Sequence, residues 1–264
     1  MLDAHCHLDD PRFADDLDEV LARARAAGVR RFVVAGVGPA RWPRQCQLAE
    51  NCADISVTFG MHPWLAAQST PAELEQAIAG LVSRIRGAGM KTPVGIGEIG
   101  LDRSPRVPAD SQARQRFAFR MQLDAARSLD LPVVLHVVRA HDTVLEILGA
   151  DGAPTRGGMV HGFSASPEIA EAYQRLGFHI SLGGAITAPN ARKVRAAAAR
   201  VREHLLLCET DSPDGAPYGS GGRRNEPANL PEIVRVLADL RDTSPEHIAS
   251  LTYTNARSLF LLEN

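Results

Sequence analysis

The sequence predicts a single (β/α)₈ TIM-type barrel over residues 1–264, with its active site at the carboxyl ends of the strands. Two observations predict this fold. The chain has 264 residues, the usual length of such a barrel, and short β-type runs alternate with longer helical stretches throughout. A doubly wound open sheet is the alternative, but the glycine-rich phosphate loop that would favour it after the first strand is not in the sequence.

Eight runs are expected to form strands. They are Leu2–His7, Arg31–Ala35, Ile55–Gly60, Val94–Glu98, Val133–Val137, Met159–Gly162, His179–Gly183 and Leu205–Glu209. The amphipathic or alanine-rich segments between and after them are expected to be helical. These are Asp15–Ala27, Arg41–Cys52, Pro71–Arg86, Ser111–Leu129, Thr143–Leu148, Pro167–Leu176, Ala191–His204, Pro227–Leu240 and 245–262. The long irregular stretch Ser212–Asn225 follows the eighth strand, where a barrel would place a substrate loop.

Composition excludes some classes of protein. Hydrophobic residues make up 45% and charged residues 23%, as in ordinary globular proteins, and the net charge of −2 shows no basic excess. Non-specific coating of nucleic acid is therefore not expected, and a substrate phosphate must be held locally by a metal or a few arginines. The amino terminus does not resemble a signal peptide, no apolar run could span a bilayer, and the four cysteines show no CxxC spacing. We expect a cytoplasmic monomer that does not bind membranes.

Histidines give the strongest functional signal. His5 and His7 lie on the first expected strand, two residues apart, so their side chains point to the same face and Cys6 points to the other. Two such imidazoles can share one metal ion, although a pair of buried, hydrogen-bonded histidines is the alternative. His136 and His161 fall at the ends of the fifth and sixth strands, where either one alone could be a core histidine.

Two carboxylates complete the pattern. Glu98 ends the fourth expected strand, where a buried carboxylate is costly unless it is paired with an arginine or bound to metal. Neither of the two lysines, Lys91 and Lys193, ends a strand, so a lysine is not available there to bridge two metal ions. Glu98 is therefore the available bridging ligand. Asp211 follows the eighth strand, where a turn or a helix cap is the alternative.

The combination of these residues predicts a metal centre. Strands one, four, five, six and eight each end in a metal-competent side chain, and together they offer four imidazoles and two carboxylates. Six ligands exceed what one tetrahedral ion needs, which indicates two divalent ions. Imidazoles suit Zn²⁺ or Mn²⁺ better than a dedicated Mg²⁺ cage.

Motifs across the whole chain resemble the TatD-type metal-dependent hydrolases of the amidohydrolase superfamily. The matching pieces are DAHCHLD at 3–9, GMHP at 60–63, GIGEIGLD at 95–102, LH at 135–136, HGFSAS at 161–166, GGAIT at 183–187, ETDSP at 209–213 and RNEPANLP at 224–231. The resemblance implies a barrel in which one ion is held by His5, His7 and Asp211. It implies that His136 and His161 hold the second ion and that Glu98 bridges the two. Because relatives include enzymes that use Mg²⁺, the ions could be Zn²⁺, Mn²⁺ or Mg²⁺.

The resemblance also implies a phosphodiesterase or deoxyribonuclease. His62 then lies near the substrate phosphate, although a simple turn at His62-Pro63 is the alternative. Asn225 and Glu226 shape the pocket, although Asn225 could instead cap the helical region that Pro227 opens. Arg139, Arg223 and Arg224 are further candidates to hold substrate charge, with a solvated surface as their alternative.

Two departures from the family pattern affect the substrate side. Many relatives have an aromatic pair after GLD, where this chain has Arg103-Ser104-Pro105. Many also have an arginine two residues after the fifth-strand histidine, where this chain has Val138, with Arg139 one step later.

Three functions are therefore considered. The first is hydrolysis of a phosphodiester, exonuclease-like, by a metal-bound hydroxide, with Asp211 as the base and Glu98 as its catalytic partner. The second is cleavage of carboxylic esters, lactones, amides or aminoacyl esters at the same site. The third is a metal-binding barrel without catalytic activity. Substrate partners are accordingly a nucleic acid or a small phosphodiester or ester.

Overall fold

The computed structural model describes residues 1–87 and 93–263, so Lys91 lies outside the described residues. In this part of the chain eight segments form strands. They are β1 (Leu2–Cys6), β2 (Arg31–Val34), β3 (Ile55–Phe59), β4 (Gly95–Asp102), β5 (Val133–Val138), β6 (Gly158–Val160), β7 (Phe178–Leu182) and β8 (Leu206–Cys208).

Helices alternate with these strands. They are α1 (Leu17–Ala26), α2 (Trp42–Asn51), α3 (Pro63–Gln68), α4 (Pro71–Arg86), α5 (Gln112–Leu129), α6 (His141–Asp151), α7 (Pro167–Arg175), α8 (Arg192–Ala198), α9 (Leu230–Leu240) and α10 (Pro245–Leu259). Short 3₁₀ turns occur at Pro11–Phe13, Ala109–Ser111, Gly184–Thr187, Glu203–Leu205 and Pro227–Asn229.

The sheet order follows the chain order from β1 to β8, and the registered strand pairs are parallel. The chain then returns to β1, because the Asp211 amide donates to the His5 carbonyl and the His7 amide donates to the Ser212 carbonyl. Parallel strands in sequence order, each followed by helical crossovers, form a TIM-type (β/α)₈ barrel. The predicted fold class is therefore confirmed.

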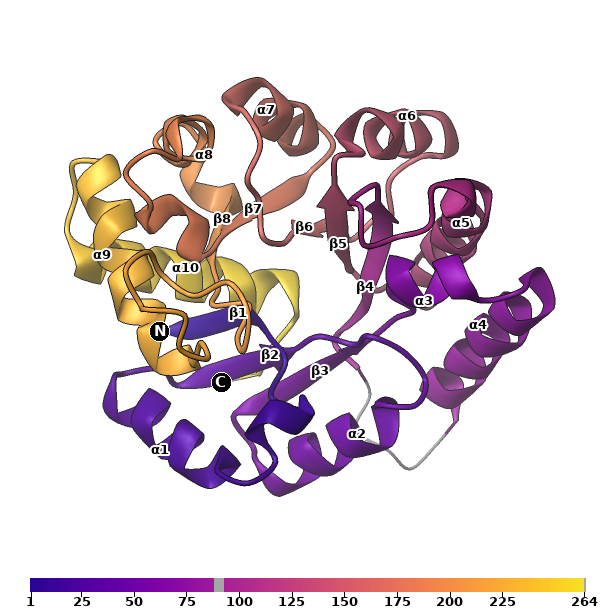
Figure 1. Cartoon of the computed structure of the whole chain (residues 1–264), viewed down its shortest axis with the longest axis horizontal. Helices are drawn as coiled ribbons and strands as arrows, with labels where there is room; N and C mark the ends of the chain where they lie inside the picture. Colours follow the sequence, from indigo (N-terminus) through magenta and orange to yellow (C-terminus); the bar gives the residue numbers. More distant parts are fainter. Residues whose placement is uncertain (88–92, 264) are drawn as a thin grey trace. The chain divides into compact units, whose positions relative to one another are not determined.

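The described residues fall into two compact units. Among these residues, the first unit comprises 1–34, 54–56 and 161–263, and the second comprises 35–53, 57–87 and 93–160. Within the first unit β1 lies beside β2, and α10 packs on β8 and β1 (Figure 1). Within the second unit β4 lies beside β5, and α5 packs on β4 and α4 (Figure 1). The prediction of a single domain stays a prediction.

Burial on both faces explains why these strands read as apolar runs. All residues of β1, β4 and β8 are buried, as expected for parallel strands covered by helices. Polar residues that fall on such strands must therefore be hydrogen-bonded or must bind a ligand.

Helix boundaries follow local chemistry. α4 begins where the Thr70 hydroxyl accepts from the Glu73 amide and the Glu73 carboxylate accepts from the Thr70 amide, which is a capping box with Pro71 as the first helical residue. α5 ends at Leu129, and its C-cap Asp130 adopts a left-handed conformation with a φ of 51°.

Several elements have other bounds than predicted, and the differences at β4, α3 and α8 have identifiable causes or consequences. β4 extends to Asp102, four residues beyond the predicted end at Glu98, because its register with β5 shifts between Ile96 and Ile99 and pairing then resumes. Glu98 therefore lies within the strand. The residues after His62 form α3, where the sequence analysis considered only a turn.

The predicted helix Ala191–His204 is also too long, since α8 ends at Ala198. The cause lies in distant partners: the Arg241 guanidinium donates to the carbonyls of Ala198 and Val201, and the Gln174 side chain accepts from the Arg202 amide. These bonds satisfy the backbone in a non-helical path. Among the residues that the structure describes, no helix is both long and apolar enough to cross a membrane.

Candidate metal centre

His5, His7 and Asp211 form the first candidate ligand group, which lies in the first unit. Asp211 Oδ1 lies 3.6 Å from His5 Nε2 and 3.4 Å from His7 Nε2, and the two imidazole centroids are 5.0 Å apart. The alternation of β1 produces this arrangement, since the intervening Cys6 thiol contacts the Val33 carbonyl on β2. The structure thus brings together the three residues predicted to share one ion.

The backbone fixes Asp211 against β1. Its amide donates to the His5 carbonyl, and its φ of 55° is left-handed, a conformation that aspartate tolerates better than most residues. Burial favours the protonated carboxyl, but the hydrogen bond from His7 and the neighbouring imidazoles outweigh it and lower the pKa of Asp211 to about 2. The side chain is 28% exposed, so an ionised oxygen remains accessible beside two imidazoles.

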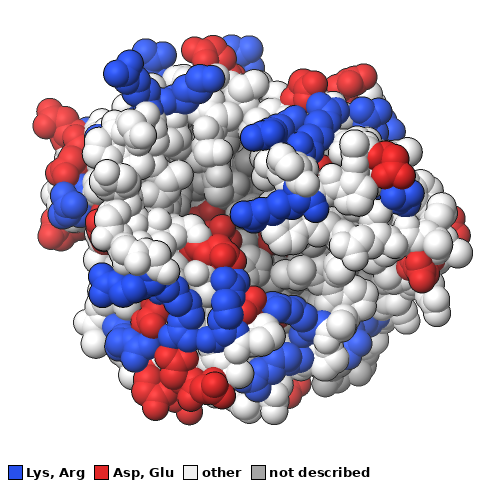
Figure 2. All heavy atoms as spheres, viewed as in Figure 1, with Lys and Arg blue, Asp and Glu red and all other residues white. Residues whose placement is uncertain are grey.

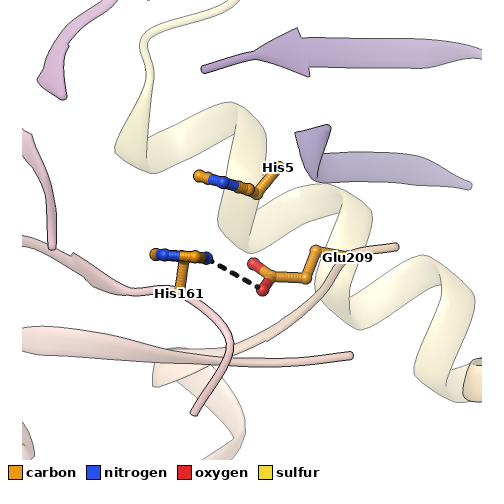
Figure 3. A group of neighbouring side chains, drawn as sticks. All are labelled: His5, His161 and Glu209. Carbon is orange, nitrogen blue, oxygen red and sulfur yellow. Dashed lines mark ion pairs between the residues drawn. The ribbon is translucent and has the colours of Figure 1, made fainter. Parts of the chain in front are cut away.

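His161 joins His5 in a second group of the same unit, together with Glu209. The imidazoles of His5 and His161 are stacked, with centroids 4.0 Å apart and an interplanar angle of 11°. His161 Nδ1 lies 3.6 Å from Glu209 Oε1 (Figure 3). Glu209 is fully buried at the end of β8, and its carboxylate accepts from the Gly162 amide and the Ser181 hydroxyl.

Sequence reasoning missed Glu209. A signal was present, because Glu209 precedes Asp211 by two residues and buried glutamates are uncommon without a partner. Its hydrogen bonds tie the end of β8 to Gly162, which follows His161, and to Ser181 on β7.

His62, Glu98 and His136 form the third group, which lies in the second unit. Glu98 Oε1 lies 2.7 Å from His136 Nδ1 and 3.4 Å from His62 Nε2. Glu98 is therefore paired with two imidazoles. His62 is the N-cap of α3, and its Nδ1 accepts from the Trp64 amide at 3.1 Å.

The donor chemistry of these groups fits divalent ions. Each group offers at least three nitrogen or carboxylate oxygen atoms that lie within 4.8 Å of one another. Each of the six predicted ligands belongs to at least one of the three groups. Mixed imidazole and carboxylate donors are suited to Zn²⁺ and similar metals. The predictions that His136 and His161 share an ion and that Glu98 bridges two ions stay predictions.

The predicted substrate residues have varied surroundings. Asn225 is fully buried, and its amide group donates to the carbonyls of Thr210 and Asp214, so the side chain holds the segment that follows β8. Arg139 is exposed at the end of β5. Their predicted roles in substrate binding stay predictions.

Glu226 belongs to a charge network within the first unit. It accepts from Arg23 and Arg224, and Arg224 also pairs with Asp16 at 2.6 Å. On the face drawn in Figure 2, Lys and Arg groups lie beside Asp and Glu groups, with uncharged residues between them. The charge of Arg224 is thus compensated by acidic neighbours.

Clusters of imidazoles and carboxylates on a TIM-type barrel are typical of metal-dependent hydrolases, and this chain is of that class. The family model described as TatD related DNase matches residues 2–261, and the chain therefore belongs to the TatD-related DNase family. The predicted family is confirmed.

Similar proteins agree with this assignment over their full lengths. The chain is 36% identical to the uncharacterized metal-dependent hydrolase YjjV of Escherichia coli K12, with 98% of this chain and 97% of the relative covered. It is 33% identical to the 3'-5' ssDNA/RNA exonuclease TatD of Salmonella typhimurium, with 98% of each chain covered. The crystal structure of E. coli YjjV matches with a TM-score of 0.90 at 36% identity, covering 100% of this chain and 98% of that one.

Proposed function

We propose that this metal-dependent hydrolase is a phosphodiesterase that removes nucleotides from the ends of single-stranded nucleic acid. The observation that carries the proposal is the His5, His7 and Asp211 group, in a chain alignable over 98% of its length with a relative named as a 3'-5' ssDNA/RNA exonuclease. The single-strand preference rests on that relative.

Two divalent ions are proposed as cofactors, Zn²⁺, Mn²⁺ or Mg²⁺. His5, His7 and Asp211 would hold one ion, His136 and His161 the other, and Glu98 would bridge them. Bound ions supply Lewis acidity, which brings the pKa of water toward neutrality and polarises a phosphoryl oxygen.

Asp211 is proposed as the general base. The side chain is 28% exposed, which leaves a carboxylate oxygen accessible to an attacking water. The adjacent imidazoles of His5 and His7 orient that oxygen, because both Nε2 atoms lie within 3.6 Å of it.

His62 is proposed as a hydrogen-bond donor to substrate. Because Nδ1 accepts from the Trp64 amide, the proton of the neutral imidazole resides on Nε2. That N–H can donate to a phosphate oxygen or to Glu98, which lies 3.4 Å away. Arg139, exposed after β5, would hold substrate charge, and Asn225 with Glu226 would shape the pocket.

Hydrolysis of a small carboxylic ester, lactone or amide is the second candidate. The compensated charge of Arg224 and the net charge of −2 favour it, because neither provides the basic surface that long nucleic acids usually need.

The test is nucleotide release from a 5'-labelled and a 3'-labelled single-stranded oligonucleotide by the metal-loaded protein, with a carboxylic ester assayed in parallel. Asp211→Asn is expected to lower release at least about 100-fold, since it removes the proton acceptor. Asp239→Asn, on the exposed side of α9, is the matched control and is expected to retain wild-type release.

If the protein releases no nucleotide from the oligonucleotide but hydrolyses the ester rapidly, the second candidate function is favoured. Turnover of neither class by a folded, metal-loaded protein would support a barrel that binds metal without catalysis.

A further inference from the structure

Asp102 is a buried carboxylate to which the proposed mechanism gives no part. It ends β4 in the second unit and is 1% exposed. Its Oδ2 lies 3.3 Å from His136 Nε2 and accepts from the Trp64 indole N–H at 2.6 Å. Its Oδ1 accepts from the Ser104 amide at 2.6 Å.

The main chain fixes Asp102 as firmly as its side chain does. Its amide donates to Gln115 Oε1 at 2.8 Å, and its carbonyl accepts from Gln115 Nε2 at 3.0 Å. In the β4–β5 register Gly100 is paired with His136 and Asp102 with Val138. The sheet therefore holds this carboxylate and the imidazole of His136 in a set relation.

His136 has a carboxylate at each ring nitrogen. Nδ1 lies 2.7 Å from Glu98 Oε1, and Nε2 faces Asp102. A neutral imidazole carries only one N–H, so one nitrogen donates a proton and the other presents a lone pair. The protein environment of the two carboxylates decides which nitrogen binds a metal.

The two carboxylates differ in that environment. Asp102 already accepts from Trp64 and Ser104, so its oxygens are occupied by protein donors. Glu98 instead belongs with His62 and His136 to a group of atoms that could surround an ion. When the proton lies on Nε2, that N–H donates to Asp102, and the lone pair of Nδ1 is directed toward the side of the ring where Glu98 lies.

We propose that Asp102 is a positioning residue that holds the proton on His136 Nε2 and so presents the Nδ1 lone pair to the metal ion. This arrangement of carboxylate, histidine and metal orients a ligand and raises its basicity. The inference rests on the proposed role of His136 as a metal ligand. Trp64 takes part because its indole N–H anchors the same Asp102 oxygen that faces His136.

The experiment measures Zn²⁺ binding to the metal-free full-length protein by calorimetry and the His136 tautomer by ¹⁵N NMR of the imidazoles. In the wild type, the proton is expected on Nε2 and Zn²⁺ on Nδ1. Asp102→Asn is expected to weaken binding of one ion about 10- to 100-fold. Trp64→Phe removes only the indole N–H and is expected to cause a smaller loss in the same ion.

The matched control is Asp142→Asn, an exposed carboxylate that pairs with Arg103, and it should bind Zn²⁺ as the wild type does. If Asp102→Asn does not fold, Trp64→Phe decides the question alone. The inference would be overturned if a folded variant kept the Zn²⁺ affinity and the His136 tautomer of the wild type. It would also be overturned if the wild-type protein carried the His136 proton on Nδ1.

No substrate enters these measurements, so they separate this inference from the proposed function. The expected tautomer and affinity loss without any nucleotide release would uphold the role of Asp102 and reject the nuclease. Nucleotide release with unchanged Zn²⁺ affinity in Asp102→Asn would do the reverse.

Discussion

At the scale of single residues, buried polar side chains organise the segments that carry the candidate ligands. Asn225 bonds to backbone groups on both sides of Asp211, and Glu209 bonds to the residue that follows His161. Sequence reasoning found His5 and His7 because the alternation of side chains along one strand is a local pattern. It found Asp211 because the end of another strand is also recognisable locally. It missed Glu209, whose partners Gly162 and Ser181 lie 47 and 28 residues away along the chain. It gave no role to Asp102, because the ring contacts with Trp64 and His136 span 38 and 34 residues.

Replacing Asn225 by alanine tests the role of that side chain. The buried carbonyls of Thr210 and Asp214 would lose their donors, so the free energy of unfolding should fall by about 1–3 kcal/mol. Urea denaturation measures the change. Asn51→Ala, at an exposed position at the end of α2, is the control and should change stability little. An equal, small change in both variants would show that Asn225 does not hold this segment.

At the scale of elements, β4 and α3 show what a sequence pattern leaves open. The glycine-rich run 95–102 contains no clear stop signal, and the register shift that lets β4 continue depends on its partner β5. α3 is short and begins with a histidine cap, which is not among the common cap residues. In contrast, the bounds of α4 match the prediction because Thr70, Pro71 and Glu73 mark its start locally.

The capping box of α4 provides a prediction at this scale. Thr70→Ala removes the hydroxyl that accepts from the Glu73 amide, so the protein should lose about 1 kcal/mol of stability. Chemical denaturation should show a lower midpoint with an unchanged slope. Thr254→Ala, on the exposed side of α10, serves as the comparison. A loss no larger than that of Thr254→Ala would mean that the capping box does not stabilise α4.

At the scale of the whole molecule, the fold class was predictable because eight apolar runs alternate with helices along one chain. The order β1 to β8 and the family match agree with that prediction. The substrate was less predictable. Its contacts depend on loops such as 212–225, where Arg224, a candidate to hold substrate charge, is paired with Asp16 and Glu226 in the structure.

Metal removal should change the stability of the whole protein. Imidazoles and carboxylates from separate segments meet in each candidate group, so ions that bind the folded state must stabilise it. At a free ion concentration about 100 times Kd the gain is about 2.7 kcal/mol, which corresponds to a rise in Tm of about 5–10 °C. Thermal unfolding with and without chelator measures it, and an unchanged Tm would contradict metal binding by the folded protein.

We propose that a two-ion centre in this barrel hydrolyses phosphodiesters. The most direct test strips the protein of metal and titrates Zn²⁺ or Mn²⁺ back while following nucleotide release from an end-labelled single-stranded oligonucleotide. We predict no release without metal and a rise that saturates near two equivalents per chain. Full release by the stripped protein, or no release at any metal content, would contradict the account.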